Sequence, residues 1–170
     1  MMKTKKKPFL IIIASLLLFS CTLLYYFQWE KNSVYTNTIA KEEYAPDFKL
    51  KKGITYYSIL KSHDENILFL WASTCSHCEK AIEYMKTKKI YSKIKNRVFT
   101  VSIDEKIDDV KYHSKDFPIY LDYNYKIFKK YKCNHVPSMF IINSEGKIIG
   151  SSEGGNAVIL LLDEFIDHNY

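Results

Sequence analysis

Residues 71–80 read WASTCSHCEK, and this stretch determines how the rest of the chain is interpreted. It follows the apolar run 67–70, which is short enough to be a buried strand, and it precedes residues 81–86, whose apolar positions have helical spacing. The first turn of a helix carries unpaired N–H groups and the positive end of the helix dipole, and both stabilise a thiolate. We therefore predict that Cys75 is a nucleophile and that Cys78, one turn further along, can form a disulfide with it.

The composition indicates one globular domain and argues against a nucleic-acid partner. The chain has 170 residues, and its 47% hydrophobic content can supply a core. The net charge is +6, but lysines 3, 5, 6 and 7 supply four of those charges, which leaves +2 for the rest. That excess is too small to predict binding to nucleic acid. The four cysteines are too few for a disulfide-stapled scaffold, and an isolated Cys-x-x-Cys suits a redox or metal role.

The first 43 residues are predicted to tether the domain to a membrane. Residues 1–7 form a basic cytoplasmic tail, and residues 8–29 carry no charge and are long enough to cross a bilayer, which takes about 20 residues. Aromatic residues within 25–29 fit the membrane interface, and the preceding lysines place the later domain outside the cytoplasm. We predict a single-pass transmembrane signal anchor at 8–29, a linker at 30–43 and a folded domain at 44–170.

Two alternatives to this anchor concern processing of the N-terminus. A cleaved signal peptide would need small residues before a cleavage site, and we find no good site. Residues 18–21, LFSC, loosely resemble the sequence at which lipoproteins are processed, with Cys21 as the lipidated residue. The apolar run continues past Cys21, so the uncleaved anchor is favoured. Both the uncleaved anchor and a lipid on Cys21 would keep the domain at a membrane.

Strands and helices are predicted to alternate after residue 66. The predicted strands are 67–71, 98–103, 119–121, 139–142 and 147–150. The predicted helices are 76–88, 108–114, 124–131 and 156–168. Residues 47–50 and 54–57 are predicted to form a small hairpin ahead of them. This order indicates an α/β domain with one central sheet and helices on both faces.

Three motifs resemble the thioredoxin superfamily. The pattern Trp-Ala-x-x-Cys-x-x-Cys at 71–78, after a buried strand, resembles its active site. Residues 44–50, YAPDFKL, resemble the start of its membrane-tethered TlpA/ResA-like branch. Residues 136–143, VPSMFIIN, followed by EGK at 145–147, resemble the cis-proline strand and hairpin of that branch. The resemblance covers 44–170, and three motifs in order are far more specific than a lone Cys-x-x-Cys.

This resemblance implies a fold, an activity and a substrate groove. The fold would be thioredoxin-like, with a central mixed sheet, and the activity would be extracytoplasmic protein thiol-disulfide exchange. Pro137 would be cis and opposite Cys75, and the backbone of Val136 would pair with an extended client segment. The sequence alone also allows Pro137 merely to begin the following strand. Expected partners are protein thiols and disulfides and a membrane electron donor or acceptor; we expect no cofactor and a monomer.

Residues around the cysteines are predicted to tune the reaction. Ser76 and His77 separate the two cysteines, and Trp71 ends the preceding strand. His77 occupies the place of the histidine in the Cys-Pro-His-Cys site of the oxidant DsbA, where it can stabilise a thiolate; the alternative is an exposed histidine without a large effect. Two acids common in relatives are absent, because Phe69 and Ala81 occupy their positions. The direction of electron flow depends on how far the pKa of Cys75 is lowered.

The main alternative function is a copper or zinc handling module. Cys75, His77 and Cys78 supply three ligands, so a closed zinc site would also need Cys133 or His135. Cys133 is predicted to be a small buried hydrophobic residue, with a third redox thiol as the alternative. Peroxidase chemistry is less favoured, because the pattern around Cys75 lacks the proline and threonine spacing of a peroxiredoxin.

Overall fold

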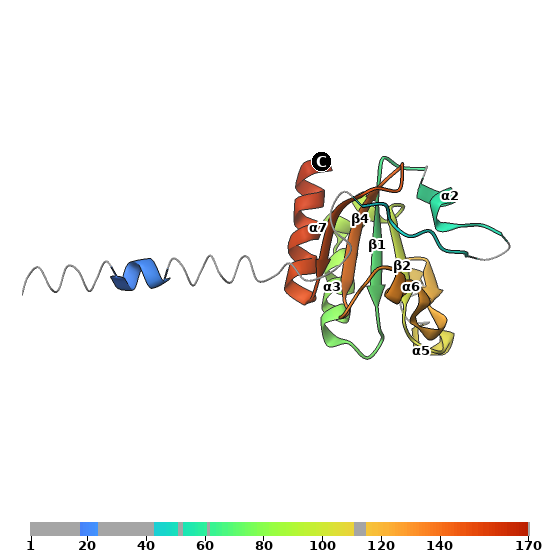
Figure 1. Ribbon diagram of the computed structural model, residues 1–170, viewed down its shortest axis with the longest axis horizontal. Helices are drawn as coiled ribbons and strands as arrows, with labels where there is room; N and C mark the ends of the chain where they lie inside the picture. Colours follow the sequence, from blue (N-terminus) through green and yellow to red (C-terminus); the bar gives the residue numbers. More distant parts are fainter. Residues whose placement is uncertain (1–17, 24–42, 51–52, 61, 111–114, 170) are drawn as a thin grey trace, which may run out of the picture. The chain divides into compact units, whose positions relative to one another are not determined.

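A five-stranded sheet forms the centre of the computed structural model, which describes residues 18–23, 43–50, 53–60, 62–110 and 115–169 (Figure 1). The strands are β1 (Glu65–Trp71), β2 (Val98–Ser102), β3 (Ile119–Leu121), β4 (Ser138–Asn143) and β5 (Ile148–Glu153). Their order is β3-β2-β1-β4-β5. The first three strands are parallel, whereas β4 is antiparallel to β1 and β5. The predicted mixed sheet is confirmed.

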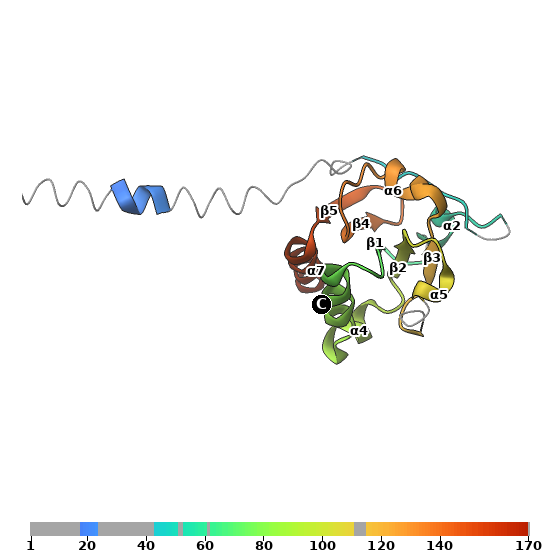
Figure 2. The ribbon, with the colours of Figure 1, turned by 90° about the horizontal axis from the view of Figure 1, so that it is seen from below.

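Helices cover both faces of this sheet (Figure 2). One face is covered by α3 (Ser76–Lys86), α4 (Lys88–Ile94) and α7 (Gly155–Asn169). The other face is covered by α2 (Tyr56–Leu60) and α6 (Lys126–Lys130). The short helix α5 (Ile107–Val110) follows β2, and the 3-10 helix η2 (Tyr123–Tyr125) leads into α6. The prediction of helices on both faces is confirmed.

The central strand β1 separates two hydrophobic clusters. Phe69 and Trp71 belong to the cluster under α3 and α7, whereas Leu68 and Leu70 belong to the cluster under α2 and α6. Successive strand residues point to opposite faces, so a strand covered on both sides reads as a continuous apolar run. This packing explains why residues 67–71 lack polar alternation, and it holds the loop after β1 between two packed layers.

One local expectation was wrong, and another was confirmed only in part. The predicted helix 76–88 is interrupted at Thr87, whose backbone is extended (φ −56°, ψ 137°), so α3 ends and α4 begins there. The hairpin predicted at 47–50 and 54–57 is confirmed in part: Lys49 and Thr55 form an antiparallel bridge, and it is flanked by bonds from the N–H of Leu50 to the carbonyl of Ile54 at 2.8 Å and from the N–H of Tyr56 to the carbonyl of Phe48 at 2.9 Å. The chain turns into α2 at Tyr56, because a helix brings Tyr56 and Leu60 onto one buried side, where both pack in the core.

The N-terminal expectations fall mainly outside the described residues. The chain divides into two compact units, 1–34 and 35–170. Within the first unit, residues 18–23 form a short helix with exposed side chains. The predicted tail, most of the predicted anchor and nearly all of the linker lie outside the described residues. Among the helices that the structure describes, none is both long and apolar enough to cross a bilayer. The domain boundaries stay a prediction.

Candidate active site

The candidate site begins where β1 passes into α3. Cys75 is the N-cap of α3, with an extended backbone (φ −95°, ψ 106°). The backbone N–H of Cys78 donates to Cys75 Sγ at 3.1 Å, and the N–H of Glu79 donates to the carbonyl of Cys75, also at 3.1 Å. A sulfur at this position accepts one of the N–H groups that a helix start leaves unpaired, and it lies at the positive end of the helix dipole. This arrangement favours a thiolate at Cys75 when the site is reduced.

The two cysteines of this site form a disulfide and differ in accessibility. Their Cα atoms are 5.2 Å apart. Cys75 is partly exposed, whereas Cys78 is 0% exposed and packs in the cluster between the sheet and α7. Phe69 and Ala81, the positions at which the resemblance implies acids, are buried in the same apolar cluster. Cys75 is therefore the more accessible residue of the pair.

The loop before β4 forms the second wall of the site. The peptide bond between Val136 and Pro137 is cis. The carbonyl oxygen of Val136 lies 3.6 Å from Cys75 Sγ. Val136 is partly exposed and Pro137 is buried. The expected cis bond and its position opposite Cys75 are confirmed, and the chain thus places a partly exposed residue, Val136, beside the sulfur of Cys75.

Asp104 holds the loop between β1 and α3. Its carboxylate accepts the backbone N–H of Ser73 at 2.8 Å and the hydroxyl of Ser73 at 2.7 Å, and it also accepts the hydroxyl of Ser102. No pattern in the sequence had predicted a role for this residue. Asp104 closely follows β2, which is parallel to β1, so residues beyond both strand ends meet at one edge of the sheet. The signal in the sequence that could have predicted it is an acidic residue just after the strand that neighbours β1.

The three predicted tuning residues lie in different environments. Trp71 is buried at the end of β1, whereas Ser76 and His77 are exposed. The ring of His77 lies against the start of α7, because a Cβ atom built on Gly155 would come within 2.8 Å of His77 Nδ1. Gly155 therefore provides the space that this ring occupies. The effect of His77 on the thiolate stays a prediction.

Cys133 does not join the Cys75–Cys78 pair. It is 8% exposed and packs in the cluster under α2 and α6, whereas Cys75 packs against the cluster on the opposite face of the sheet. Burial raises the pKa of Cys133 to about 12, and its thiol faces the carbonyl of Tyr131 at 3.7 Å. Within the described ranges, no three His, Cys, Asp or Glu side chains are grouped to hold a metal ion. Cys133 is therefore a small buried residue, as predicted, and not a third redox thiol.

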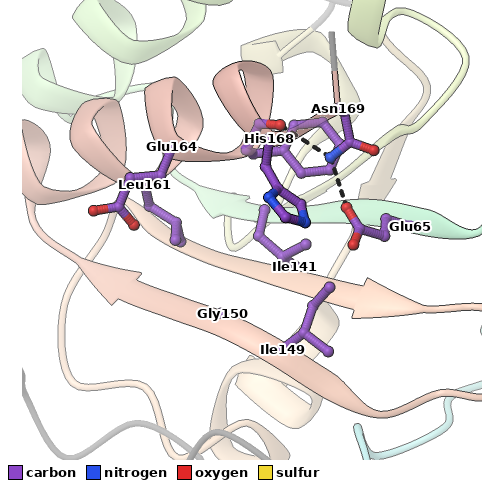
Figure 3. Close-up of a pocket in the computed structure, with 9 residues that line it drawn as sticks. Glu65, Ile141, Ile149, Gly150, Leu161, Glu164, His168 and Asn169 are labelled. Atoms are coloured by element: carbon purple, nitrogen blue, oxygen red, sulfur yellow. Dashed lines mark hydrogen bonds between the residues drawn. The ribbon is translucent and has the colours of Figure 1, made fainter.

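A hollow of about 260 Å³ lies far from this site, between the end of α7 and strands β4 and β5 (Figure 3). Glu65 lines it at the start of β1, whereas Cys75 follows the end of the same strand. The side-chain amide of Asn169 donates to Glu65 Oε2 at 2.7 Å and to the carbonyl of Phe165 at 3.0 Å. These bonds fasten the end of α7 to the sheet. Because the hollow lies at the opposite end of β1 from Cys75, it is not part of the site around the two cysteines.

Comparisons with known proteins agree with this geometry. The thiol-disulfide oxidoreductase ResA of Bacillus thuringiensis subsp. konkukian is 29% identical over 130 residues, which is 72% of this chain and 66% of that protein. The chain thus spans just under two thirds of that relative's length. ResA of Bacillus subtilis is 27% identical over 154 residues, which is 85% of this chain and 84% of that protein.

A solved structure and a family profile complete the comparison. A crystal structure described as the thiol:disulfide interchange protein DsbE of Chlorobium tepidum has a TM-score of 0.60, with 23% identity over 76% of this chain and 97% of that chain. This likeness supports the thioredoxin-like fold, and the resemblance inferred from the three motifs is confirmed. The AhpC/TSA family profile matches residues 42–151, more than half of the chain. The chain therefore belongs to the AhpC/TSA family and has its thioredoxin-like fold.

Proposed function

We propose that this chain is a membrane-tethered, extracytoplasmic protein thiol-disulfide oxidoreductase. One observation carries the proposal: Cys75, a partly exposed residue at a helix start, has a buried disulfide partner in Cys78, and its sulfur lies 3.6 Å from the carbonyl oxygen of Val136. The relatives named above are thiol-disulfide oxidoreductases, which supports the same activity.

The reaction is two successive thiol-disulfide exchanges. The thiolate of Cys75 attacks one sulfur of a client disulfide; that bond breaks, and the other client sulfur leaves and takes up a proton. The thiol of Cys78 then loses its proton and attacks Cys75 Sγ, which releases the second client thiol. The client gains two electrons and two protons, and the Cys75–Cys78 pair is oxidised. The reverse sequence oxidises a client dithiol.

The residues of the site divide this work. The start of α3 stabilises Cys75 as attacking and leaving thiolate, and burial keeps Cys78 for the intramolecular step. The backbone of Val136 pairs with an extended client segment, and Pro137 holds that backbone beside the sulfur. His77 tunes the stability of the thiolate.

The direction of electron flow follows from the reduction potential of the pair. A value near that of thioredoxin, about −270 mV, makes the protein a reductant, and a value near that of DsbA, about −120 mV, makes it an oxidant. The potential is measured by equilibrating the full chain with glutathione buffers and quantifying the free thiols of Cys75 and Cys78. Either direction needs an electron donor or acceptor in the membrane, because an external domain has no direct access to cytosolic reductants.

Membrane tethering rests on residues 8–29. Their apolar length and the lysines before them support a single-pass anchor. The short described helix within this run exposes Leu18, Phe19 and Leu23, as a lipid-facing segment would. Resistance to alkaline extraction and protease digestion of the domain from outside the cell test this arrangement. Loss of membrane association in a Cys21→Ser variant would instead show lipoprotein anchoring.

Trapping of clients tests the activity itself. In a Cys78→Ser variant of the full chain, the mixed disulfide cannot be resolved, so client proteins should accumulate covalently bound to Cys75 and be released by dithiothreitol. The matched control is the Cys75→Ser, Cys78→Ser double variant, which should trap nothing. Insulin reduction by the wild-type chain gives a second readout.

The same trapping experiment distinguishes thiol-disulfide exchange from the metal-handling alternative. Absence of any trapped client and of insulin reduction, together with tight binding of copper or zinc by the reduced chain, would contradict the proposal and favour a metal module. Binding should then depend on Cys75, His77 and Cys78.

A further inference from the structure

The loop that presents Val136 is fastened on both sides of that residue. The backbone N–H of Asn134 donates to Glu153 Oε1 at 2.9 Å, and the hydroxyl of Ser138 donates to the carbonyl of His135 at 2.5 Å. On the other side, the N–H of Gly154 donates to the carbonyl of Pro137 at 2.8 Å. The position of Val136 is therefore set by the groups that hold its neighbours.

Glu153 is the charged member of this arrangement. It is the last residue of β5, pairs with Ser138 across the β4–β5 ladder, and is only 5% exposed. Its Oε1 atom lies 3.4 Å from the Ser138 hydroxyl, in addition to accepting the Asn134 N–H. A carboxylate loses hydration when it is buried and regains stability only through hydrogen bonds, and a bond from an N–H to a charged oxygen is stronger than a neutral one. Its hydrogen bonds therefore stabilise one conformation of the loop.

We infer that Glu153 is a positioning residue that makes the site selective for polypeptide disulfides. The inference rests on the proposed function and deepens it. Glu153 is too deeply buried to contact a client. It acts instead by holding the Val136 backbone in the position at which an extended client segment can pair with it. A small disulfide needs only the sulfur of Cys75, whereas a peptide disulfide needs both that sulfur and the Val136 backbone.

The test compares two substrates in the full-length chain. Reduced Glu153→Ala protein is expected to react with the small disulfide DTNB within about twofold of wild type. Its kcat/KM for a synthetic extended peptide with one disulfide, with dithiothreitol as final reductant, should fall about tenfold and mainly through KM, because losing the hydrogen bond frees the loop. Glu153→Gln should lose less than Glu153→Ala, because the amide oxygen can still accept the Asn134 N–H, although through a weaker, uncharged bond.

A matched control and a second variant keep the test decisive. Ser152→Ala changes the preceding residue of β5, which is partly buried, and should leave both rates unchanged. If thermal unfolding shows that Glu153→Ala does not fold, Ser138→Ala replaces it and must show the same preferential loss with the peptide. Equal losses with both substrates, no loss with either, or a Glu153→Gln variant as impaired as Glu153→Ala would each overturn the inference.

The two proposals fail in different ways. If the wild-type chain reacts with neither substrate, the oxidoreductase function itself is wrong, and the role of Glu153 falls with it. If the wild-type chain uses both substrates but the variants show no difference between them, only the role of Glu153 is overturned.

Discussion

Cys78 and Cys133 are both buried, yet they lie on opposite faces of one sheet in very different surroundings. Cys78 lies one helical turn after Cys75 and forms a disulfide with it. Cys133 packs among side chains of the opposite cluster, where burial raises its pKa to about 12. Burial alone therefore does not decide whether a cysteine can take part in exchange. Cys78 can take part because a second sulfur, at the start of a helix, lies within bonding distance of it, and Cys133 has no such neighbour among the described residues.

The face that holds Cys133 is built from stacked and tilted aromatic rings. The ring centroids of Phe48 and Tyr56 are 4.8 Å apart, and those of Tyr131 and Phe140 are 4.9 Å apart. The hydroxyls of Tyr56 and Tyr131 are buried without a hydrogen-bond partner among the described residues, and burial raises the pKa of both phenols. This face is specialised for packing, whereas the face with α3 and α7 also supports the redox pair.

The sharpest test of this comparison replaces one cysteine on each face. Cys75→Ser should reduce insulin reduction by about a thousandfold or more, to background, because a hydroxyl is a far weaker nucleophile than a thiolate. Cys133→Ala should leave the rate with the small disulfide DTNB within about twofold of wild type, provided that the variant folds. A large loss of activity in folded Cys133→Ala would show that the two faces are chemically coupled.

The next largest effect is expected at Asp104, which holds the active-site loop on the redox face. Asp104→Ala removes the acceptor for Ser73 and Ser102, so we expect a loss of about 2–3 kcal/mol in unfolding free energy and slower reaction of Cys75 with DTNB and peptide alike. Urea unfolding and stopped-flow kinetics measure the two effects. Unlike Glu153→Ala, this variant should not discriminate between substrates, and a loss confined to the peptide would contradict the assignment.

A pH dependence is expected from the other face. The pKa of Cys133 is about 12 in the folded chain, against 9.0 for an ordinary cysteine thiol. Above pH 9 the unfolded chain therefore loses this proton while the folded chain keeps it, so stability falls as pH rises from 9 toward 12. At pH 10.5 the unfolding free energy should have fallen by about 2 kcal/mol on account of the Cys133 thiol.

The Cys133→Ala variant isolates that contribution, because the other titrating groups remain. Urea unfolding at pH 8 and pH 10.5 should show a smaller loss in the variant than in the wild type. Equal losses would show that the Cys133 thiol titrates normally. Iodoacetamide at pH 8 should correspondingly fail to label Cys133 until the chain is unfolded.

The smallest expected effect is a gain in stability at Tyr131. Its hydroxyl is buried in the aromatic cluster without a partner among the described residues, so Tyr131→Phe removes a desolvated polar atom and keeps the ring. We expect the unfolding free energy to rise by about 1 kcal/mol, measured by urea denaturation. A decrease would mean that the hydroxyl is hydrogen-bonded in solution.

Local patterns predicted the redox centre well because its parts are adjacent in the chain. An apolar strand, two cysteines and a helix start lie within residues 67–86, so hydrophobic periodicity and spacing were sufficient to place Cys75 and Cys78. Pro137 was placed through a resemblance, since nothing in its immediate neighbours requires a cis bond. The break at Thr87 was missed because the apolar and polar residues around it continue the helical pattern.

The sequence by itself determined the α/β order, the Cys-x-x-Cys pair at a helix start, and the apolar strands that form the core. Only the tertiary structure decided which distant groups support that pair: Asp104 against Ser73, Val136 against Cys75, Glu153 against Asn134, and Cys133 on the far face. The physical reason is that periodicity and helix dipoles act over a few neighbouring residues. Hydrogen bonds across the ends of strands depend instead on how β1, β2, β4 and β5 are paired, which no short stretch of sequence encodes.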